Sequence, residues 1–327
     1  MLIAYEFLDG RLHKISQPSG AVGKRIWLDL LSPTPAEDQE VEKLLGISIP
    51  TREEMDEIEL SARLYQEDRA RFMTIIALTA LGDDKPNKTP ITFILKDEVL
   101  VTVRYEDPTP FQLFVSRSQK PTAASIGGTG ELVMLGLLEA LTDRLADALE
   151  RVGDEIETFS SQVFRNKSSN AKKNARNLEG LIEQIGRKND YLSLVQESLV
   201  SISRLVAYHA AAEGTNGRAR NESRQRVKLI QRDVTSLGEH SKFLAGKINF
   251  LLDAILGLIN LEQNQIIKIF SVAAVVFLPP TLVASIYGMN FEHMPELGWR
   301  FGYPWAIGLM IFSAIMPFLY FKRRGWL

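Results

Sequence analysis

Two long uncharged apolar runs close the sequence, and they restrict its folding more than any other feature. The first is residues 269–287, IFSVAAVVFLPPTLVASIY, and the second is residues 301–321, FGYPWAIGLMIFSAIMPFLYF. About 20 apolar residues in a helix span the hydrocarbon core of a bilayer. A buried core helix would account poorly for two such runs in succession. We therefore expect transmembrane helix 1 at 269–287 and transmembrane helix 2 at 301–321, joined by a loop at 288–300.

The charges that flank these runs orient them. Lys268 precedes the first run, and the basic tail 322–327 begins with Lys-Arg-Arg directly after the second. The connecting loop holds Glu292, Glu296 and a single basic residue, Arg300. Because cytoplasmic flanks carry the excess of Lys and Arg, we expect both ends of the hairpin in the cytoplasm and the loop outside. The first residues offer no basic segment typical of a signal peptide, so a cytoplasmic N-terminus is expected as well.

The composition argues against several classes of protein. The 327 residues include 38 basic and 40 acidic ones, whereas nucleic-acid binders usually carry a strong basic surplus, so no nucleic-acid partner is expected. With no cysteine, the chain can form no disulfide, thiolate metal site or thiol nucleophile. No HExxH or GxSxG motif occurs, and we expect His209 and His240 on helix surfaces. We therefore expect neither an enzyme nor an organic cofactor, and any bound metal must use oxygen or imidazole ligands.

The chain before the apolar runs divides by pattern into segments. Residues 1–117 carry short runs rich in β-branched and aromatic residues, separated by turn formers, and predict a cytoplasmic α/β domain of five to seven strands. Thr34 before a proline, with Gly46 beyond the helical pattern, predicts a capped helix. Residues 118–130 are small, polar and glycine-rich, and we interpret them as a linker rather than a phosphate-binding turn. Residues 131–221 carry leucines at helical spacing around the turn sequence EGTNGR and predict an amphipathic helical hairpin.

Residues 222–268 continue the helical pattern into the first apolar run. One helix from residue 222 to Tyr287 would be ~100 Å long at about 1.5 Å per residue. No single globular core is that long, so 222–268 is expected to be a stalk helix that continues into the membrane. Pro279 and Pro280 leave the carbonyl groups one turn earlier without helical donors, which lipid cannot supply. Those carbonyl groups require a partner helix, water or a bend.

Polar and small residues gather on one face of the first apolar run. At about 100° per residue, five of them and Leu278 fall within an arc of ~100°, opposite a face of valine, isoleucine and phenylalanine. Such a stripe in a bilayer usually faces protein or water. Two helices cannot enclose a water-filled path, so transport would need several copies around a pore; alternatively, the hydroxyl groups bond back to their own helix or pack against another helix. The sequence leaves both interpretations open. The polar or small members of the stripe are Asn264, Ser271, Ala274, Thr281 and Ser285.

The residues that follow the first run carry a resemblance to a known family. Gly288, Met289 and Asn290 resemble the Gly-Met-Asn signature that closes the first of two C-terminal transmembrane helices in the CorA magnesium transporters. The likeness is close from Asn249 to Leu327, where the chain resembles the proteobacterial members, and the first 248 residues match mainly in layout. The resemblance implies a funnel-shaped homopentamer in the bacterial inner (plasma) membrane, with both termini in the cytoplasm. It also implies a channel for divalent cations, mainly Mg²⁺ with Co²⁺ and Ni²⁺ as secondary cargo, gated by intracellular Mg²⁺.

The resemblance further implies roles for pore residues. Asn290 would form a ring that binds the hydrated ion at the outer mouth, and Gly288 and Met289 would form the turn that presents it. Asn264 would form a polar ring near the inner end of the pore. Glu292 and Glu296 in the external loop would attract cations. The other pore-lining positions implied are Ile267, Phe270, Leu278 and Thr281, of which the three apolar ones resemble the hydrophobic gate, and Ser271 and Ser285 share their stripe.

Asp253 aligns with a carboxylate that binds regulatory Mg²⁺ between subunits in the family. Its partner would come from the α/β domain of a neighbouring subunit, and Asp83 and Asp84 are the candidates; otherwise Asp253 is a solvated acid of the stalk. A zinc transporter of the ZntB type is an alternative, because His293 beside Glu292 could bind zinc, although those proteins usually depart from Gly-Met-Asn. A membrane-anchored scaffold protein is a third hypothesis.

Overall fold

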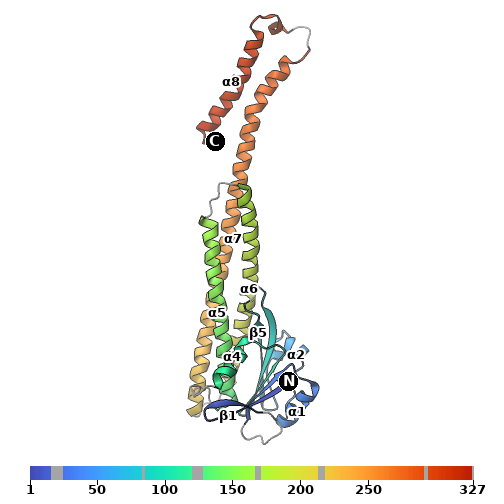
Figure 1. Cartoon of the computed structure of the whole chain (residues 1–327), viewed down its shortest axis with the longest axis vertical. Coiled ribbons are helices and arrows are strands. Elements are labelled where there is room, and N and C mark those ends of the chain that lie inside the picture. Colours follow the sequence, from blue (N-terminus) through green and yellow to red (C-terminus); the bar gives the residue numbers. More distant parts are fainter. Residues whose placement is uncertain are drawn as a thin grey trace. The chain divides into compact units, whose positions relative to one another are not determined.

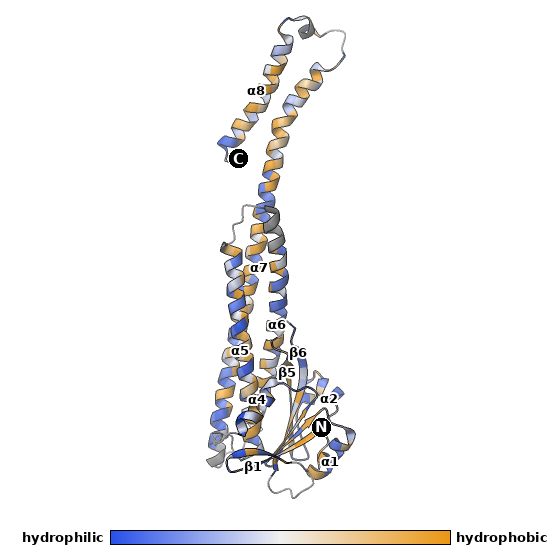
Figure 2. Ribbon diagram, in the orientation of Figure 1, coloured by the Kyte–Doolittle hydropathy of each residue, from blue (hydrophilic) through white to orange (hydrophobic). Residues whose placement is uncertain are grey.

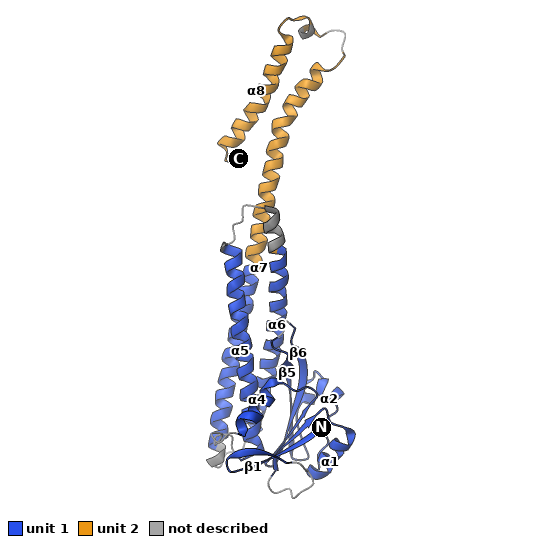
Figure 3. Ribbon diagram, in the orientation of Figure 1, with its two compact units in different colours: residues 1–166, 179–251 blue, residues 167–178, 252–327 orange. Residues whose placement is uncertain are grey.

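The computed structural model describes residues 1–15, 25–82, 85–119, 128–165, 171–212, 218–290 and 294–325. The chain forms two compact units (Figure 3). Unit 1 comprises Met1–Asn166 and Glu179–Leu251, and unit 2 comprises Lys167–Leu178 and Leu252–Leu327. Helix α7, Arg218–Tyr287, contributes residues to both units.

Unit 1 is built on a mixed β-sheet (Figure 1). Among the described residues it has seven strands, within the predicted range, in the order β2-β1-β3-β7-β6-β5-β4. Strands β3 and β7 run parallel, and the other neighbouring pairs are antiparallel. The strands are β1 (Leu2–Leu8), β2 (Arg11–Ile15), β3 (Arg25–Leu31), β4 (Leu64–Glu67), β5 (Ala70–Thr79), β6 (Asn87–Lys96) and β7 (Val99–Arg104).

Helices cover both faces of this sheet, which explains why its central strands are nearly continuous apolar runs. On one face, Val41 of α1 (Pro35–Leu45) and Met55 of α2 (Arg52–Asp56) pack in one apolar cluster with the strands. On the other face, Phe111 of α4 (Thr109–Ser118) lies against Trp27 of β3 and Phe93 of β6, with ring centroids 6.4 Å apart in both pairs. Because successive strand residues point to opposite faces, each strand contributes to two cores.

Helix α1 confirms the capped helix predicted from the sequence. Thr34 is the N-cap, its hydroxyl accepts from the amide of Glu37, and the Glu37 carboxylate accepts from the amide of Thr34. Gly46 ends the helix with φ of 61° and donates its amide to the carbonyl of Glu42 at 2.7 Å. The Thr34 amide is the main reason that the pKa of Glu37 is lowered to about 2.

A close backbone approach explains one glycine of the segment interpreted as a linker. Residues 120–127 lie outside the described part of the chain, and α5 (Gly130–Arg165) begins at Gly130. The amide of Gly130 donates to the carbonyl of Glu98 at 2.8 Å, and a β-carbon on Gly130 would lie 2.3 Å from the amide nitrogen of Leu100. Only glycine fits so close to the backbone of the β6–β7 turn. Gly130 therefore allows the start of α5 to pack directly against that turn.

Helix α6 (Ala171–Ala212) contacts strand β5 at Ile76, beyond the residues of β5 that pair with β4. The hydroxyl of Ser201 accepts from the amide of Ile76 at 3.0 Å. Further along, His209 Nδ1 lies 3.1 Å from the Arg71 guanidinium, and His209 Nε2 lies 2.9 Å from the carboxylate of Glu131 on α5. Since arginine only donates, Nδ1 accepts and Nε2 carries the proton. The prediction that His209 lies on a helix surface is wrong, because it is fully buried among these partners; His240 is exposed as predicted.

Unit 2 contains the end of α7, the short 3-10 helix η2 (Pro295–Gly298) and helix α8 (Gly302–Arg323). Within the described residues, α7 and α8 are the two helices long and apolar enough to cross a membrane. Figure 2 shows the apolar residues that dominate α8 and the neighbouring end of α7. Helix α7 continues through Pro279 and Pro280 to Tyr287.

Candidate functional site

The last five turns of α7 have a covered face and an exposed face. Val272 is 5% exposed, and Ala306 of α8, which returns beside α7 (Figure 1), is equally buried. Val276, Pro279 and Val283 are partly buried on the same side of α7 as Val272. Since successive residues are about 100° apart around the helix axis, these four positions lie roughly on the side opposite the polar stripe. Helix α8 therefore lies against part of the apolar face of α7 and leaves the stripe uncovered.

Most side chains of the stripe, and of the implied pore-lining positions beside it, are open to the surroundings in this single chain. Leu278 is 65% exposed and Phe270 is 71% exposed. A lipid environment is unfavourable for uncovered amide and hydroxyl groups, so a stripe that α8 does not cover requires water or another protein surface. Asn264, Ile267, Thr281 and Ser285 are likewise exposed, and Ser271 is partly buried.

One hydroxyl of the stripe does bond back to its own helix. Thr281 donates to the carbonyl oxygen of Phe277 at 2.7 Å, one turn earlier. This is the arrangement that the sequence left open as an alternative to a role in transport. A hydroxyl that donates in this way keeps its lone pairs as acceptors, so Thr281 can still accept a hydrogen bond from a water molecule.

The Gly-Met-Asn sequence forms the end of α7. The amide of Gly288 donates to the carbonyl of Ala284 at 2.9 Å, and the amide of Met289 donates to that of Ile286 at 3.3 Å. Asn290 follows, exposed, and its side chain makes no hydrogen bond within the described residues. Its amide is therefore available to a ligand or to another copy of the chain.

The predicted external-loop residues cannot be placed. Glu292 and His293 lie outside the described residues, as does the side chain of Glu296. Beyond the loop, the ring of Trp299 lies 6.3 Å from Phe301 and 6.4 Å from Trp305. Aromatic residues of this kind are typical of the level where a membrane meets water.

Asp253 is exposed on α7, and no ion pair joins it to other described residues. It precedes Asn264 by about three helical turns, so the two side chains share one face of the helix. Asp83 and Asp84, its predicted partners, lie outside the described residues. No group of three or more carboxylates or histidines suited to a metal occurs among the residues the structure does describe. A cation at Asp253 would therefore need water or another copy of the chain to complete its ligands.

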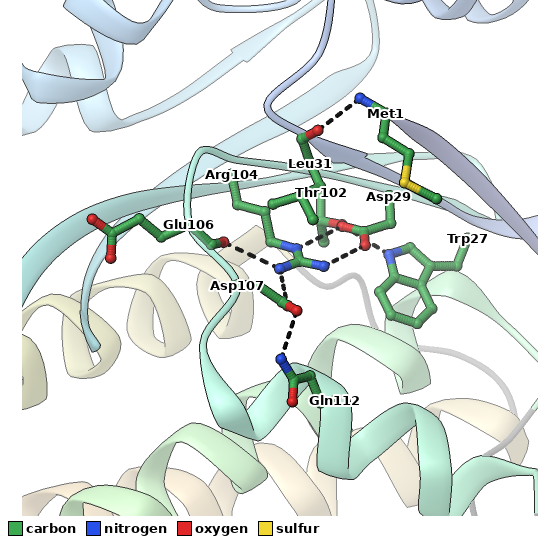
Figure 4. A network of polar contacts seen from close by, with 9 residues as sticks. All are labelled: Met1, Trp27, Asp29, Leu31, Thr102, Arg104, Glu106, Asp107 and Gln112. Atoms are coloured by element: carbon green, nitrogen blue, oxygen red, sulfur yellow. Dashed lines mark hydrogen bonds and ion pairs between the residues drawn. The ribbon is translucent and has the colours of Figure 1, made fainter. Parts of the chain in front are cut away.

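The polar groups buried around Asp29 and Arg104 in unit 1 make hydrogen bonds to one another (Figure 4). The Arg104 guanidinium donates to both carboxylate oxygens of Asp29, at 3.0 and 2.8 Å, and Thr102 donates to the same carboxylate at 2.7 Å. Trp27 in turn donates to Thr102 at 2.9 Å. Burial opposes the charge on Arg104 and would lower its pKa. The hydrogen bonds that the guanidinium donates to Asp29 and Asp107, together with their negative charges, outweigh this effect and raise the pKa. This arrangement fastens β3 to β7 and leaves Asp29 no free oxygen for a metal or substrate.

Comparison with known proteins decides the family. The family described as CorA-like Mg²⁺ transporter protein matches residues 23–323. The chain belongs to this family. The magnesium transport protein CorA of Yersinia pseudotuberculosis is 36% identical over 328 residues, covering 100% of both chains. The protein of the same name in Escherichia coli K12 is 35% identical with the same coverage.

Solved structures agree with the CorA-like fold. The complete CorA magnesium transporter from Methanocaldococcus jannaschii matches with a TM-score of 0.82 and 19% identity, over 100% of this chain and 99% of that one. The cytoplasmic domain of ZntB from Vibrio parahaemolyticus matches 79% of this chain and 97% of its own, with a TM-score of 0.57 and 10% identity. The likeness to ZntB is thus confined to the fold of the soluble part, whereas the CorA-like match also includes the two membrane helices.

Proposed function

We propose that the chain carries Mg²⁺ across the bacterial inner membrane as a homopentameric channel, without catalysing a chemical reaction. The observation that carries this proposal is the polar stripe of α7 on the side that α8 leaves uncovered. One hairpin cannot enclose water, but five copies with their stripes toward a common axis would line a path with Asn264, Thr281 and Ser285. The outer ring of helices would then be α8, whose residues are apolar almost throughout.

Asn290 would select the ion at the outer end of this path. Magnesium dehydrates reluctantly, so a pore can bind it through its water shell. Five amide carbonyls would accept hydrogen bonds from the coordinated water, and a neutral ring would release the ion more readily than a ring of carboxylates. Glu292 and Glu296 of the loop, repeated by symmetry on the external side, would raise the local cation concentration. Co²⁺ and Ni²⁺ would be secondary cargo.

The gate would be apolar. Rings of Ile267, Phe270 and Leu278 in a narrow pore would exclude water and so block hydrated ions until the helices separate. Mg²⁺ bound between copies at Asp253 would favour the closed state, because it brings the stalks together by bridging carboxylates that otherwise repel. Loss of intracellular Mg²⁺ would release the stalks and open the path.

The deciding experiment is Mg²⁺ uptake into liposomes that contain the wild type or the Asn290→Ala variant. We expect uptake by the wild type, driven by the membrane potential at about 2.3 kcal/mol per charge for each 100 mV, and a large loss in the variant. Gln265→Ala, an exposed amide of α7 away from the stripe, is the matched control and should leave uptake unchanged. Equal uptake by the wild type and Asn290→Ala would contradict the proposal that a ring of Asn290 side chains selects the ion. Zinc uptake in place of Mg²⁺ would favour the ZntB-type alternative, and no uptake of any metal would favour the scaffold.

A further inference from the structure

A groove between α6 and α7 in unit 1 has no assigned role. Its volume is about 610 Å³. The floor is apolar, with Val206 of α6 and Val227 of α7 buried in it. Lys228 and Arg232, one turn apart on α7, outnumber Glu239 and give the lining a net positive charge. Its lining is Val206, Ala207, Ala210, Val227, Lys228, Gln231, Arg232, Thr235, Ser236 and Glu239.

Three polar groups of the groove have no partner within the described part of the chain. Neither Lys228 nor Arg232 has an ion-pair partner among the described residues. Gln231 donates its amide nitrogen to Ser203 at 2.9 Å, but its carbonyl oxygen is buried without a hydrogen-bond partner. A buried acceptor left unpaired costs about 1–3 kcal/mol. The groove therefore suits an occupant with an apolar side chain, negative charges and hydrogen-bond donors.

A segment with complementary chemistry lies elsewhere in unit 1. Ile58, between α2 and α3 (Leu60–Arg63), is 88% exposed, and Leu60, the first residue of α3, is 51% exposed. Large apolar side chains gain free energy when they are covered, at roughly 25 cal/mol per Å². Met55 anchors this segment in the core and leaves Ile58 projecting outward. The exposed acids around it, none with an ion-pair partner among the described residues, are Glu53, Asp56, Glu57 and Glu59.

The acidic segment and the groove cannot meet within one chain. Met55 packs on the sheet face that carries Phe72, whereas Arg71, the preceding residue of β5, reaches His209 of α6 from the opposite face. Figure 1 shows α2 on one side of the sheet and α5, α6 and α7 on the other. Only a second copy can bring the two surfaces together. Such a contact joins different patches of two copies, which generates a closed ring when the rotation is suitable.

We propose that the segment 53–60 of one copy docks in the α6–α7 groove of the next, with Ile58 on the apolar floor and its acids beside Lys228 and Arg232. The proposal rests on the homopentamer of the proposed function and names the cytoplasmic contact that orders its copies. The charges set the orientation of the contact more than its strength. The acids of the segment contribute charge but little apolar contact area, and Ile58 supplies that area.

Disulfide cross-linking of the full-length protein in detergent tests this contact, because the natural chain has no cysteine. We expect Ile58→Cys combined with Ala207→Cys to give covalent multimers on mild oxidation. Co-expressed single variants, one Ile58→Cys and one Ala207→Cys, should give a linked pair and no larger species. Glu40→Cys on α1, exposed in the same helical layer as α2, replaces Ile58→Cys in the control and should not link. An intact oligomer that fails to link would overturn the docking alone; a monomeric wild type would overturn the homopentamer and the docking together.

Charge reversal provides a second readout. Lys228→Glu with Arg232→Glu should lower the cross-linking rate by on the order of tenfold, because the rim charges steer the encounter. Adding Glu57→Lys and Glu59→Lys should restore most of that rate. Lys242→Glu, an exposed lysine of α7 outside the groove, should have no effect. The assigned charge pairing would be contradicted if the two Lys/Arg→Glu substitutions did not lower the cross-linking rate. It would also be contradicted if the added Glu→Lys substitutions did not restore that rate.

Discussion

The amide of Gly288 donates to the carbonyl oxygen of Ala284 at 2.9 Å, and a β-carbon on Gly288 would lie only 3.1 Å from the same oxygen. The backbone thus closes α7 so tightly that a side chain at this position would push against the preceding turn. The position of Asn290, two residues later, depends on this closure. Glycine is used here for close approach rather than for an unusual backbone angle.

We therefore predict that Gly288→Ala lowers Mg²⁺ uptake by about fivefold, the change that corresponds to about 1 kcal/mol of strain in the conformation that presents Asn290. Liposome uptake at fixed potential measures this. Gly308→Ala in α8 is the matched control, because nothing lies within 4 Å of a β-carbon there. If both variants transport as the wild type does, the turn does not set the position of Asn290.

Leu278 and Phe277 are neighbours with similar exposure, but about 100° apart around α7, so only Leu278 lies on the stripe. Leu278→Ala should widen an apolar constriction and let water enter it. We expect several-fold faster Mg²⁺ leak from liposomes with high internal Mg²⁺, where the wild type is closed. Phe277→Ala should leave the leak unchanged, and a leak that is the same in both variants would contradict a gate at Leu278.

The two membrane helices and the capped α1 could be predicted from the sequence, because each rests on local patterns: uncharged length, and Thr34 and Gly46 at the helix ends. The covered face of α7 could not be predicted, since it depends on which side α8 approaches. His209 was misplaced for a similar reason. Its polarity indicated a surface position, but Arg71 and Glu131, distant in sequence, supply both of its hydrogen-bond partners.

The groove residues Lys228 and Arg232 were likewise missed, because in sequence they are two charges on a long amphipathic helix. One signal in the sequence could have pointed to the groove. Ile58 is an apolar residue among acids and belongs to no helical or strand periodicity, so its place in the sequence suggests a contact with another, basic surface. The roles of Asn290 and Asp253 come from resemblance. The structure adds that both side chains are exposed and that Asp253 shares the face of the stripe.

Asp253 should determine how internal Mg²⁺ closes the channel. Asp253→Lys replaces a carboxylate that would attract the ion with a charge that repels it. We expect the Mg²⁺ concentration for half-closure to rise by on the order of tenfold or more, within the usual range of coupling between sites. Flux measured against internal Mg²⁺ tests this. Asp233→Lys, another exposed acid of α7, is the control, and unaltered sensitivity in Asp253→Lys would sink the assignment.

The Asp29–Arg104 pair should be important for stability rather than for transport. Arg104→Met leaves the Asp29 carboxylate buried with little compensation, which costs about 3–5 kcal/mol. The thermal unfolding midpoint in detergent should fall clearly. Lys88→Met breaks the ion pair between Lys88 and Glu197, in which each side chain is 45% exposed. This change should lower the free energy of unfolding by at most about 1 kcal/mol. Similar midpoints for the two variants would show that the buried network contributes no more than a surface pair.

Glu37 should make the α/β part less stable in acid. Its pKa is lowered to about 2, first by the Thr34 amide and against the effect of burial, from an ordinary value of 4.5. A carboxylate with a lowered pKa stabilises the fold above its ordinary pKa, and this contribution is lost as the pH falls toward the lowered value. Glu37→Gln should therefore lower the unfolding midpoint at pH 7 by the equivalent of about 1 kcal/mol, typical of a helix cap. The difference from the wild type should shrink between about pH 4.5 and 2, as protonation removes the charge from the wild type. Glu40→Gln, exposed on the same helix, should show no such convergence, and a constant difference for Glu37→Gln across this range would contradict the assigned role of its charge.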